Sequence, residues 1–392
     1  MRDSTVHIAG LGIVSALGQG AASTLQALEQ GSVRAGPIAL FDTPLRKPVF
    51  QAPVPASATP SSRTFDLAMI AVAEALDQAG LPRTGLGERT GVCLGTTVAC
   101  QLNDLAFYTA YRNPAEDPDM AAADRYLNGN LAEAVARALG AAGPAVTVVN
   151  ACSSGADAVG VALHWIRSGL CDRVLAGGAD ELNRIPLCGF HSLGIMSDTV
   201  CCPFDRDRRG LNLGEGAGIL VLESARSLAE RGATLPALFV AGYGAACDAH
   251  HLTAPRPDGS GLETAICLAL RDADRAPEDV VFTNAHGTAT PDNDRVEGAT
   301  LARLFGEQAC FLSTKGYTGH TLGAAGGIEA ALTALGLQEE WIPVSAGFEN
   351  RDPDIPVAPT VARTTIAGTA ALSTSLAFGG NNAALIIERS AD

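Results

Sequence analysis

The sequence predicts an α/β fold made of two similar halves. Strand-sized runs rich in valine, isoleucine and leucine alternate with helical stretches along all 392 residues, as expected for a sheet buried on both faces. The segments GEGAGILVLE (214–223) and GGNNAALIIE (379–388) also share a leading glycine and an apolar strand that ends in glutamate. Because each segment closes one part of the chain, a duplicated α/β half is the simplest explanation.

The expected elements follow in order along the chain. The first part has five strand-sized runs, at 5–16, 90–97, 145–151, 172–180 and 216–224. The second part has four, at 237–246, 279–287, 309–316 and 370–388. Helices are expected between them at 64–80, 131–139, 153–168, 261–274 and 322–338. We place the join near 230–238, which predicts domains 1–234 and 235–392. GLGIVS (10–15) lacks the third glycine of a dinucleotide loop and predicts a tight turn.

Composition and charge exclude several classes of protein. A formal net charge of −15 argues against binding to nucleic acid or to an anionic membrane through the overall field. No apolar run is long enough to span a membrane, and no signal peptide is recognisable. The ten cysteines form neither a disulfide pattern nor a zinc pattern, and the pair His250–His251 lacks carboxylates at ligand spacing. We therefore expect a cytoplasmic protein with reduced cysteines and no metal.

One cysteine lies at a junction that favours reactivity. In VVNACSSGADAVG (148–160) an apolar strand turns into a helix at Cys152. Unpaired backbone N–H groups and the positive end of the helix dipole favour a thiolate there. Cys152 is therefore the predicted nucleophile.

Two histidines lie at similar junctions. His286 follows a buried strand in VVFTNAHGTATPDND (280–294), and His320 precedes a small-residue helix in STKGYTGHTLGAAGG (313–327). Such junctions gather at the carboxyl ends of parallel strands, where ligands bind. A cysteine with two imidazoles suits acyl-thioester transfer, in which the imidazoles stabilise an oxyanion or enolate. It also suits a cysteine hydrolase, and the residues alone leave both open.

Lys315 stands out because the chain has only two lysines against 25 arginines. Its neighbours are small or apolar, so burial is expected. A compact ammonium fits a tight buried site in which the planar guanidinium fork of arginine would not. A buried ammonium needs a partner, which the local sequence does not name.

Taken together, the motifs resemble those of the β-ketoacyl-[acyl-carrier-protein] synthases, the elongating condensing enzymes of the thiolase-like superfamily. The resemblance runs from about residue 5 to 390 and is carried by NACSSG, NAHGTATPDND, STKGYTGHTLGAAGG, GEGAG, DAHHLTAP and FGGNN. It implies a thiolase-like fold of two halves in five layers, α-β-α-β-α. It also implies an acyltransferase that condenses a cysteine-bound acyl group with malonyl carrier protein, with loss of CO2, in fatty acid, polyketide or polyene chain elongation.

The resemblance also implies a role for each site residue. Cys152 would be the nucleophile, and His286 and His320 would stabilise the enolate. Lys315 would pair with Glu297, and the backbone N–H groups of Cys152 and Phe378 would form the oxyanion hole. Pantetheine contacts are expected from Thr253, Thr288 and Thr290. The acyl pocket is expected to include Phe190, Asn128 and Asn130. The carrier protein is expected to dock on Arg63, Arg206, Arg208 and Arg209.

Partners follow from the same resemblance. No cofactor of the chain's own is implied, because phosphopantetheine arrives on the acyl carrier protein. The expected assembly is a homodimer, or a heterodimer with a ketosynthase-like chain-length factor, without nucleic acid or membrane insertion. The alternative is that this chain is itself a chain-length-factor-like partner subunit. Such partners usually lack the nucleophile, so an intact Cys152 counts against that alternative.

Several positions depart from the family pattern. Leu376-Ala377-Phe378-Gly379-Gly380-Asn381-Asn382 stands where the family usually has Phe-Gly-Phe-Gly-Gly-Thr-Asn. Gly316 follows the lysine where serine or alanine is commoner, and TTVACQ (96–101) replaces a glycine-rich turn. These changes concern the acyl chain and not the nucleophile. They suggest a specialised chain, unsaturated or aryl-bearing.

Overall fold

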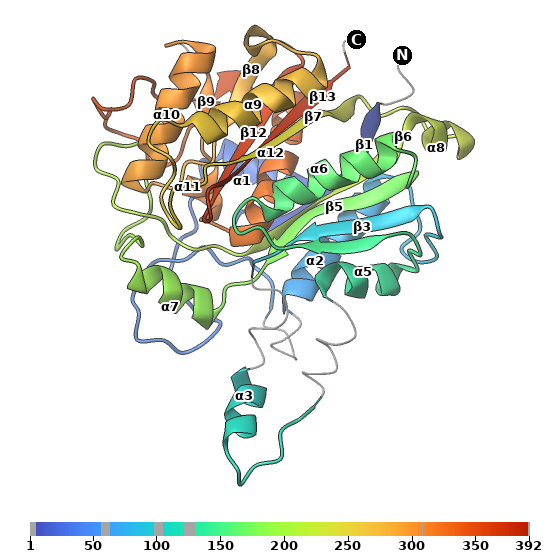
Figure 1. Ribbon diagram of the computed structural model, residues 1–392, viewed down its shortest axis with the longest axis horizontal. Coiled ribbons are helices and arrows are strands. Elements are labelled where there is room, and N and C mark those ends of the chain that lie inside the picture. The colour runs from blue at the N-terminus through green and yellow to red at the C-terminus, as the bar shows by residue number, and fades with distance from the viewer. Residues whose placement is uncertain (1–4, 56–62, 98–104, 121–129, 308, 391–392) are drawn as a thin grey trace.

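The computed structural model describes residues 5–55, 63–97, 105–120, 130–307 and 309–390 (Figure 1). The N-terminal half contains the strands β1 (Val6–Ser15), β2 (Gly18–Gln19), β3 (Thr90–Gly95), β4 (Ala145–Val148), β5 (Arg173–Asp180) and β6 (Gly216–Ser224). The C-terminal half contains β7 (Leu238–Cys247), β8 (Val280–Asn284), β9 (Phe311–Leu312), β12 (Ala370–Ala377) and β13 (Asn381–Arg389). A separate small sheet pairs β10 (Trp341–Ile342) with β11 (Thr364–Thr365).

The helices alternate with these strands. The N-terminal half has α1 (Ala21–Glu29), α2 (Arg63–Gln78), α3 (Leu105–Arg112), α5 (Leu131–Leu139), α6 (Ser154–Arg167), α7 (Arg184–Ser192) and α8 (Ala225–Glu230). The C-terminal half has α9 (Ser260–Ala273), α10 (Pro291–Phe305), α11 (Lys315–Thr318), α12 (Ala325–Glu339) and the short turns η3 (Pro277–Asp279) and η4 (Leu322–Ala324). The predicted helices are confirmed to within two residues at most ends, but α1, α3, α7, α8, α10 and α11 were not predicted.

The two halves repeat one topology, which confirms the predicted duplication. The strands lie in the order β4-β3-β5-β6-β1 in the first half and β9-β8-β12-β13-β7 in the second. Numbered along each half without the short strands β2, β10 and β11, both halves therefore read 3-2-4-5-1, and the pairing of β1 with β7 joins them into one sheet. In each, strand 2 is parallel to strands 3 and 4, and strand 5 is antiparallel to its neighbours. The similar segments found in the sequence are β6 and β13, the fifth strands. The predicted domain boundary at 234/235 lies between α8 and β7.

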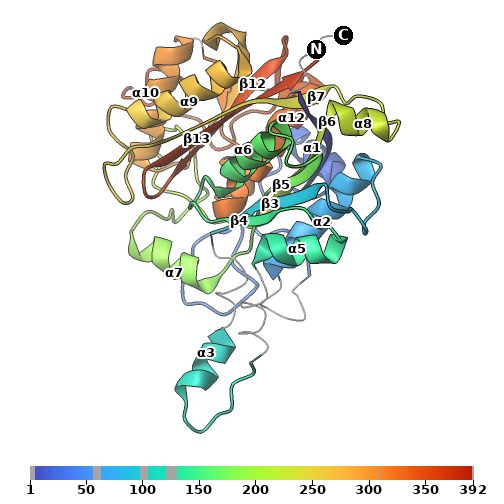
Figure 2. The ribbon, with the colours of Figure 1, turned by 45° about the vertical axis from the view of Figure 1, so that its right-hand side comes forward.

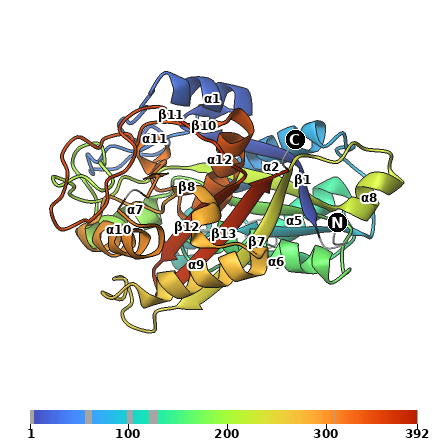
Figure 3. The ribbon, with the colours of Figure 1, turned by 90° about the horizontal axis from the view of Figure 1, so that it is seen from above.

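The helices and the two sheets form five layers (Figure 3). Helices α2 and α5 cover the outer face of the N-terminal sheet, and α9 covers the outer face of the C-terminal sheet with α10 beside it. Helices α6 and α12 lie between the sheets and contact both. α12 is buried all round from Ala325 to Leu337 and, apart from Glu329 and Thr333, carries only apolar or glycine residues there. This confirms the expected α-β-α-β-α arrangement.

Glycines bring the two central helices unusually close at their N-terminal ends. A Cβ built on Gly155 would lie 2.6 Å from the backbone nitrogen of Gly327. A Cβ on Gly326 would lie 2.4 Å from the backbone nitrogen of Ala156. No side chain fits in this contact, so the segments just before α6 and α12 meet at one point.

Two expectations about local structure are wrong. GLGIVS lies within β1 and not in a turn, because Gly10 and Gly12 allow close packing of α2. Their Cβ atoms would lie 2.1 Å from the carbonyl oxygen of Ala75 and 1.9 Å from that of Ala71. The long run at 370–388 is two antiparallel strands, β12 and β13. The chain reverses between them at Gly379 and Gly380, which have φ of 89° and 79°.

Helix α3 projects from the layered body, and both chain ends lie at the edge opposite it (Figures 1 and 2). Within the described residues, no helix combines the length and apolar character needed to cross a membrane. The cysteines there are free thiols.

Candidate active site

Cys152 lies between β4 and α6 and is 4 % exposed. The preceding Ala151 has φ of 50°, a left-handed conformation that is unfavourable for a residue with a Cβ. This tight turn places Cys152 beside His286 and His320. The sulfur of Cys152, one ring nitrogen of His286 and one ring nitrogen of His320 lie within 4.8 Å of one another. The structure thus brings together the three residues that the sequence singled out.

His286 follows β8 on a loop that Glu297 holds from α10. The carboxylate of Glu297 accepts hydrogen bonds from the backbone N–H groups of His286 and Gly287, both at 2.8 Å. It also accepts the hydroxyl of Thr374, on β12, at 2.8 Å. Gly287 has φ of 40°, and a Cβ there would lie 2.5 Å from that of Ser313, so glycine is needed at this position. Glu297 therefore supports the histidine through the backbone.

Lys315 forms its ion pair with Glu329 of α12, so the expected pair with Glu297 is wrong. Its Nζ also donates to the carbonyl oxygen of His286 at 2.6 Å and to His286 Nδ1 at 3.0 Å. Three acceptors thus match the three donors of an ammonium, an arrangement that a guanidinium could not copy. Glu329 is the functional residue that the sequence reasoning missed. The sequence does contain a signal for it, because Glu329 is the one charged residue in the small and apolar run LGAAGGIEAALTALG (322–336).

The neighbouring Gly316 departs from the family pattern for a steric reason. A Cβ at this position would lie 2.3 Å from the carbonyl oxygen of Ala346. The loop at Ala346 packs directly on the turn that carries Lys315, so serine or alanine does not fit.

The hydrogen bonds of the two imidazoles fix where their protons lie. His286 Nδ1 accepts from the Lys315 ammonium at 3.0 Å, and His320 Nδ1 accepts from the backbone N–H of Leu322 at 3.1 Å. Burial, reinforced by the charge of Lys315, lowers the pKa of both imidazoles well below the usual value. Each neutral ring therefore carries its proton on Nε2. The ring planes are 87° apart with centroids at 5.3 Å, so two N–H donors converge from different directions.

This arrangement decides against two other uses of the site. Cys152, His286 and His320 lie close enough together to hold a metal ion. A metal ion would need the lone pair of Nε2, so the ring proton would have to move to Nδ1. There it would face the N–H donor of Lys315 or of Leu322 and lose the hydrogen bond. In the same protonation state each imidazole is a hydrogen-bond donor at Nε2. A cysteine hydrolase requires a general base instead.

The resting nucleophile is a thiol. Burial raises the pKa of Cys152 to about 11, although Lys315 and the Phe378 backbone N–H, which donates to Sγ, both lower it. Burial therefore opposes the thiolate expected at the start of α6, because loss of water outweighs the favourable charges. The Phe378 contact places a second backbone donor beside the sulfur, where the predicted oxyanion hole requires one.

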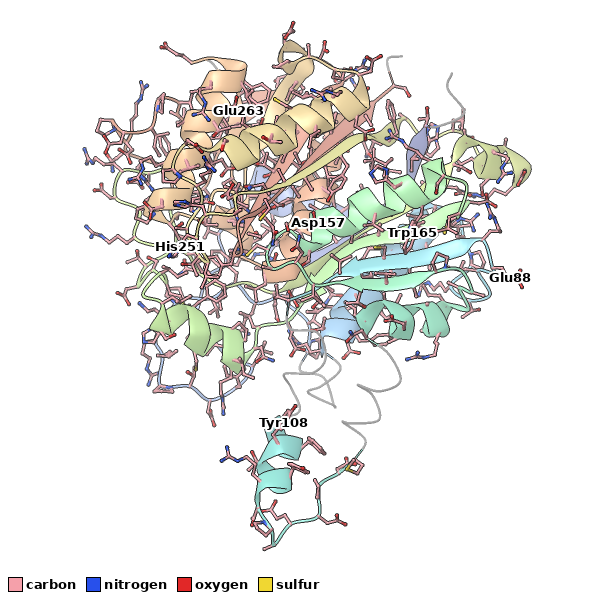
Figure 4. All side chains as sticks on the ribbon, in the orientation of Figure 1. Glu88, Tyr108, Asp157, Trp165, His251 and Glu263 are labelled. Carbon is pink, nitrogen blue, oxygen red and sulfur yellow. The ribbon has the colours of Figure 1, made fainter. Side chains whose placement is uncertain are left out.

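A cavity of about 200 Å³ opens onto Cys152. Its walls include the predicted Phe190, Thr253, Thr288, Thr290 and Phe378. The rings of Phe190 and Phe378 are stacked, 5.6 Å apart and 18° from parallel. Thr253 lies on the exposed loop of His251, which Figure 4 labels, and its backbone N–H donates to His251 Nδ1 at 3.1 Å.

Of the two predicted pocket asparagines, the structure describes only Asn130. Asn128 lies outside the described residues, as do residues 98–101 of the unusual TTVACQ turn. Asn130 is the residue that precedes α5 and does not line the cavity.

Two of the four predicted docking arginines are wrong. Arg63 is buried, and its guanidinium binds the carboxylate of Glu215 through Nε at 2.8 Å and Nη2 at 2.5 Å. Arg208 is buried and pairs with Asp352. Both guanidinium groups are bound to carboxylates inside the fold and do not face a carrier protein. Arg206 and Arg209 are exposed on the same segment as Arg208, whose Nη2 donates to the carbonyl oxygen of the cavity-lining Pro291 at 3.1 Å.

Known proteins match along the whole chain. The sequence matches the profiles of the β-ketoacyl synthase N-terminal domain over residues 45–227 and of the C-terminal domain over residues 238–349. A 3-oxoacyl-[acyl-carrier-protein] synthase 2 from Synechocystis sp. is 34% identical over 411 residues, covering 98% of each chain. The ishigamide ketosynthase/chain length factor structure has a TM-score of 0.91 at 34% identity, covering 99% of this chain and 100% of that one. A type II PKS acyl-carrier protein in complex with its ketosynthase bound to the hexaketide has a TM-score of 0.89 at 26% identity, with coverage of 99% and 100%.

Proposed function

This chain belongs to the β-ketoacyl synthase family, and from that premise we propose how its residues perform a decarboxylative condensation. The observation that carries the assignment is the clustering of the Cys152 sulfur with one ring nitrogen each of His286 and His320, all within 4.8 Å of one another, beside the Phe378 N–H. Because Nδ1 of each imidazole already accepts a hydrogen bond, Nε2–H is the donor that each ring can offer. Fixed donors of this kind stabilise negative charge that develops on a carbonyl oxygen.

In the first half-reaction, Cys152 takes the acyl group from an acyl carrier protein. The sulfur attacks the thioester carbonyl, and the backbone N–H groups of Cys152 and Phe378 receive the oxyanion. The bond to the pantetheine sulfur then breaks, and the thiol proton of Cys152 passes to that leaving thiolate. The Cys152 pKa of about 11 means that deprotonation accompanies attack and does not precede it.

In the second half-reaction, malonyl carrier protein enters the emptied cavity. The carbon–carbon bond to the carboxylate breaks, CO2 leaves, and the electron pair forms an enolate whose oxygen accepts from His286 and His320. The enolate carbon attacks the Cys152 thioester and releases the cysteine sulfur, which regains a proton. The product is a 3-ketoacyl chain two carbons longer.

The carrier protein is the proposed partner at the mouth of the cavity. The comparison structure of a ketosynthase with its acyl-carrier protein supports this choice. Carrier proteins are acidic and this chain has a formal net charge of −15, so docking needs a local cationic surface. Arg206 and Arg209 are the two predicted arginines that remain exposed for it. No cofactor of the chain's own is proposed, because the carrier delivers the pantetheine thiol.

A second subunit is proposed at the free edge of the N-terminal sheet. Strand β4 is the last strand there, and Val146 and Val149 beside that edge are 41% and 62% exposed. Tyr108 and Tyr111 of the projecting α3 are 57% and 68% exposed, and Figure 4 shows Tyr108 well away from the body. An open strand edge and exposed aromatic side chains together fit a protein interface. A second copy of this chain, or a chain-length factor as in the ishigamide structure, would cover them.

The acyl substrate is proposed to be unsaturated or aryl-bearing, as in polyene formation. The parallel Phe190–Phe378 pair offers a flat aromatic wall beside Cys152, and flat conjugated chains pack well on such a wall. Leu376, where the family usually has phenylalanine, also lines the cavity.

Intact mass spectrometry tests the function directly. We expect an acyl-sized mass gain after incubation with acyl carrier proteins, greatest for conjugated chains. Cys152→Ala should lose the gain but still release CO2 from malonyl carrier protein, because His286 and His320 remain. No gain from folded protein with any chain would instead support the partner-subunit alternative.

A further inference from the structure

Asp157, in the first turn of α6, is a buried carboxylate held by neutral donors (Figure 4). Its Oδ2 accepts from Asn150 Nδ2 at 2.6 Å and from Ser153 Oγ at 2.8 Å. Its Oδ1 accepts from the hydroxyl of Tyr243 at 2.7 Å. Burying a carboxylate is costly unless its oxygens are satisfied, so these donors are required and not incidental.

Two of the donors flank the nucleophile. Asn150 precedes Cys152 and Ser153 follows it, with Ala151 between them in its left-handed conformation. A strained turn relaxes unless the surrounding structure holds it. One carboxylate oxygen binds both ends of this turn, so Asp157 fixes the direction of the Cys152 sulfur and of its backbone N–H.

The third donor comes from the other half of the molecule. Tyr243 lies on β7, and its ring occupies the space over Gly160, where a Cβ would lie 2.4 Å from the ring. The backbone N–H of Tyr243 is held as well, by Asp272 at 3.0 Å. Neither Asp157 nor Tyr243 lines the cavity, so any effect on the reaction passes through the turn.

We propose that the Tyr243–Asp157 hydrogen bond is a positioning contact for the nucleophile. It fixes the position of Cys152, in the N-terminal half, relative to His286 and His320, in the C-terminal half. The inference rests on the proposed function, because it assigns a purpose to the orientation of Cys152. Asp157 and Tyr243 are positioning residues that touch neither substrate nor reacting atoms.

Tyr243→Phe is the sharpest test, since it removes only the hydroxyl and keeps the ring over Gly160. Two rates would be measured: acyl loading of Cys152 at saturating carrier protein, and alkylation of the Cys152 peptide by iodoacetamide at a fixed pH. We expect both rates to fall about tenfold, because one hydrogen bond to a charged group is lost. KM for the carrier protein should stay unchanged.

Ser227→Ala is the matched control. Ser227 Oγ donates to the buried carboxylate of Glu223 at 2.7 Å, the same kind of bond at the same length, at the opposite end of the N-terminal sheet. It should lose comparable thermal stability and keep both rates. This comparison separates positioning from a general loss of stability.

Gly160→Ala provides a second route, because the added methyl group displaces the Tyr243 ring without removing any polar group. It should slow both rates at least as much as Tyr243→Phe. In an Asp157→Ala background, which removes the acceptor of the Tyr243 hydroxyl, Tyr243→Phe should cost nothing further, since the two share one interaction. Should Asp157→Ala fail to fold, the two other variants still decide the matter.

Unchanged loading and alkylation in Tyr243→Phe, or an equal loss in Ser227→Ala, would overturn the inference. Failure of the proposed function looks different. If the unmutated protein accepts no acyl group from any carrier but Tyr243→Phe still slows alkylation, the condensing role is wrong and the positioning contact stands.

Discussion

The two halves share a strand order but differ in what they place at the same point. In each half a helix follows the third strand: α6 after β4 and, by way of α11, α12 after β9. The junction in the first half carries Cys152, and the junction in the second carries Lys315 and His320. A duplicated scaffold thus brings two equivalent helix starts face to face, and one carries the proposed nucleophile while the other carries a proposed donor for negative charge.

Each of these helices also carries an acid near its start that holds the segment before it. Asp157 of α6 binds Asn150 and Ser153, whereas Glu329 of α12 binds the cation Lys315. The first anchor uses neutral donors and the second uses charge. Burial raises the pKa of Glu329 to about 7 despite its cation, so protonation of Glu329 below that pH would weaken the second anchor.

Removing the charged anchor should give the largest effect. Glu329→Ala leaves the buried Lys315 ammonium without its carboxylate, and breaking a buried ion pair in this way costs about 3–5 kcal/mol. We expect that loss in the free energy of denaturant unfolding, together with loss of CO2 release from malonyl carrier protein, because Lys315 also holds His286.

Glu29→Ala serves as the control for Glu329→Ala. Glu29 pairs with Arg363, and both side chains are more than half exposed. Its removal should leave stability and activity nearly unchanged. Equal losses of stability and activity in the two variants would show that the buried Lys315–Glu329 pair contributes no more than an exposed ion pair.

The nucleophile of the first half is tested by pH. Because the folded pKa of Cys152 is raised to about 11, its thiolate fraction grows about tenfold per pH unit up to that value. Alkylation by iodoacetamide, followed on the Cys152 peptide by mass spectrometry, should therefore keep rising between pH 7 and 10. A free cysteine levels off above about 8.5. A plateau below pH 9 would show that the helix start, and not burial, controls this thiol.

A smaller effect is expected at the rim of the cavity. The double variant Arg206→Glu and Arg209→Glu should raise KM for acyl carrier protein about tenfold, with little change for a small thioester substrate. Arg83→Glu is the control, because Arg83 and Arg206 are similarly exposed, at 61% and 57%, and each pairs with a nearby acid, Asp77 and Asp207 respectively. Equal losses with the carrier and the small thioester would contradict docking at this segment.

The sequence predicted well where a pattern depends on local chemistry. Cys152, His286 and His320 each stand at a strand-to-helix junction that the apolar periodicity reveals, and the matching segments of β6 and β13 reveal the duplication. Helix α5 was predicted to the residue, since Leu131, Val135 and Leu139 form one buried face and Gly140 ends the helix with φ of 61°.

The errors concern which charged side chains pair inside the fold. The family resemblance gave Glu297 as the partner of Lys315, but the ion pair is made with Glu329 on α12. Arg63 and Arg208 looked like surface charges because nothing local shows that Glu215 and Asp352 lie opposite them. Charge pairing inside a large core is set by tertiary packing, which periodicity does not record.

The glycine contact between α6 and α12 sets where this protein can change. Gly155 and Gly326 face backbone atoms at distances that admit no side chain, so nearly every substitution on that side of the site should be lost to selection. The cavity is instead lined by side chains such as Phe190, Leu193 and Leu211, which can be exchanged without moving the backbone. New substrate preferences, whether evolved or engineered, are therefore expected from changes in this lining, while the glycine contact keeps the helix that follows Cys152 in place.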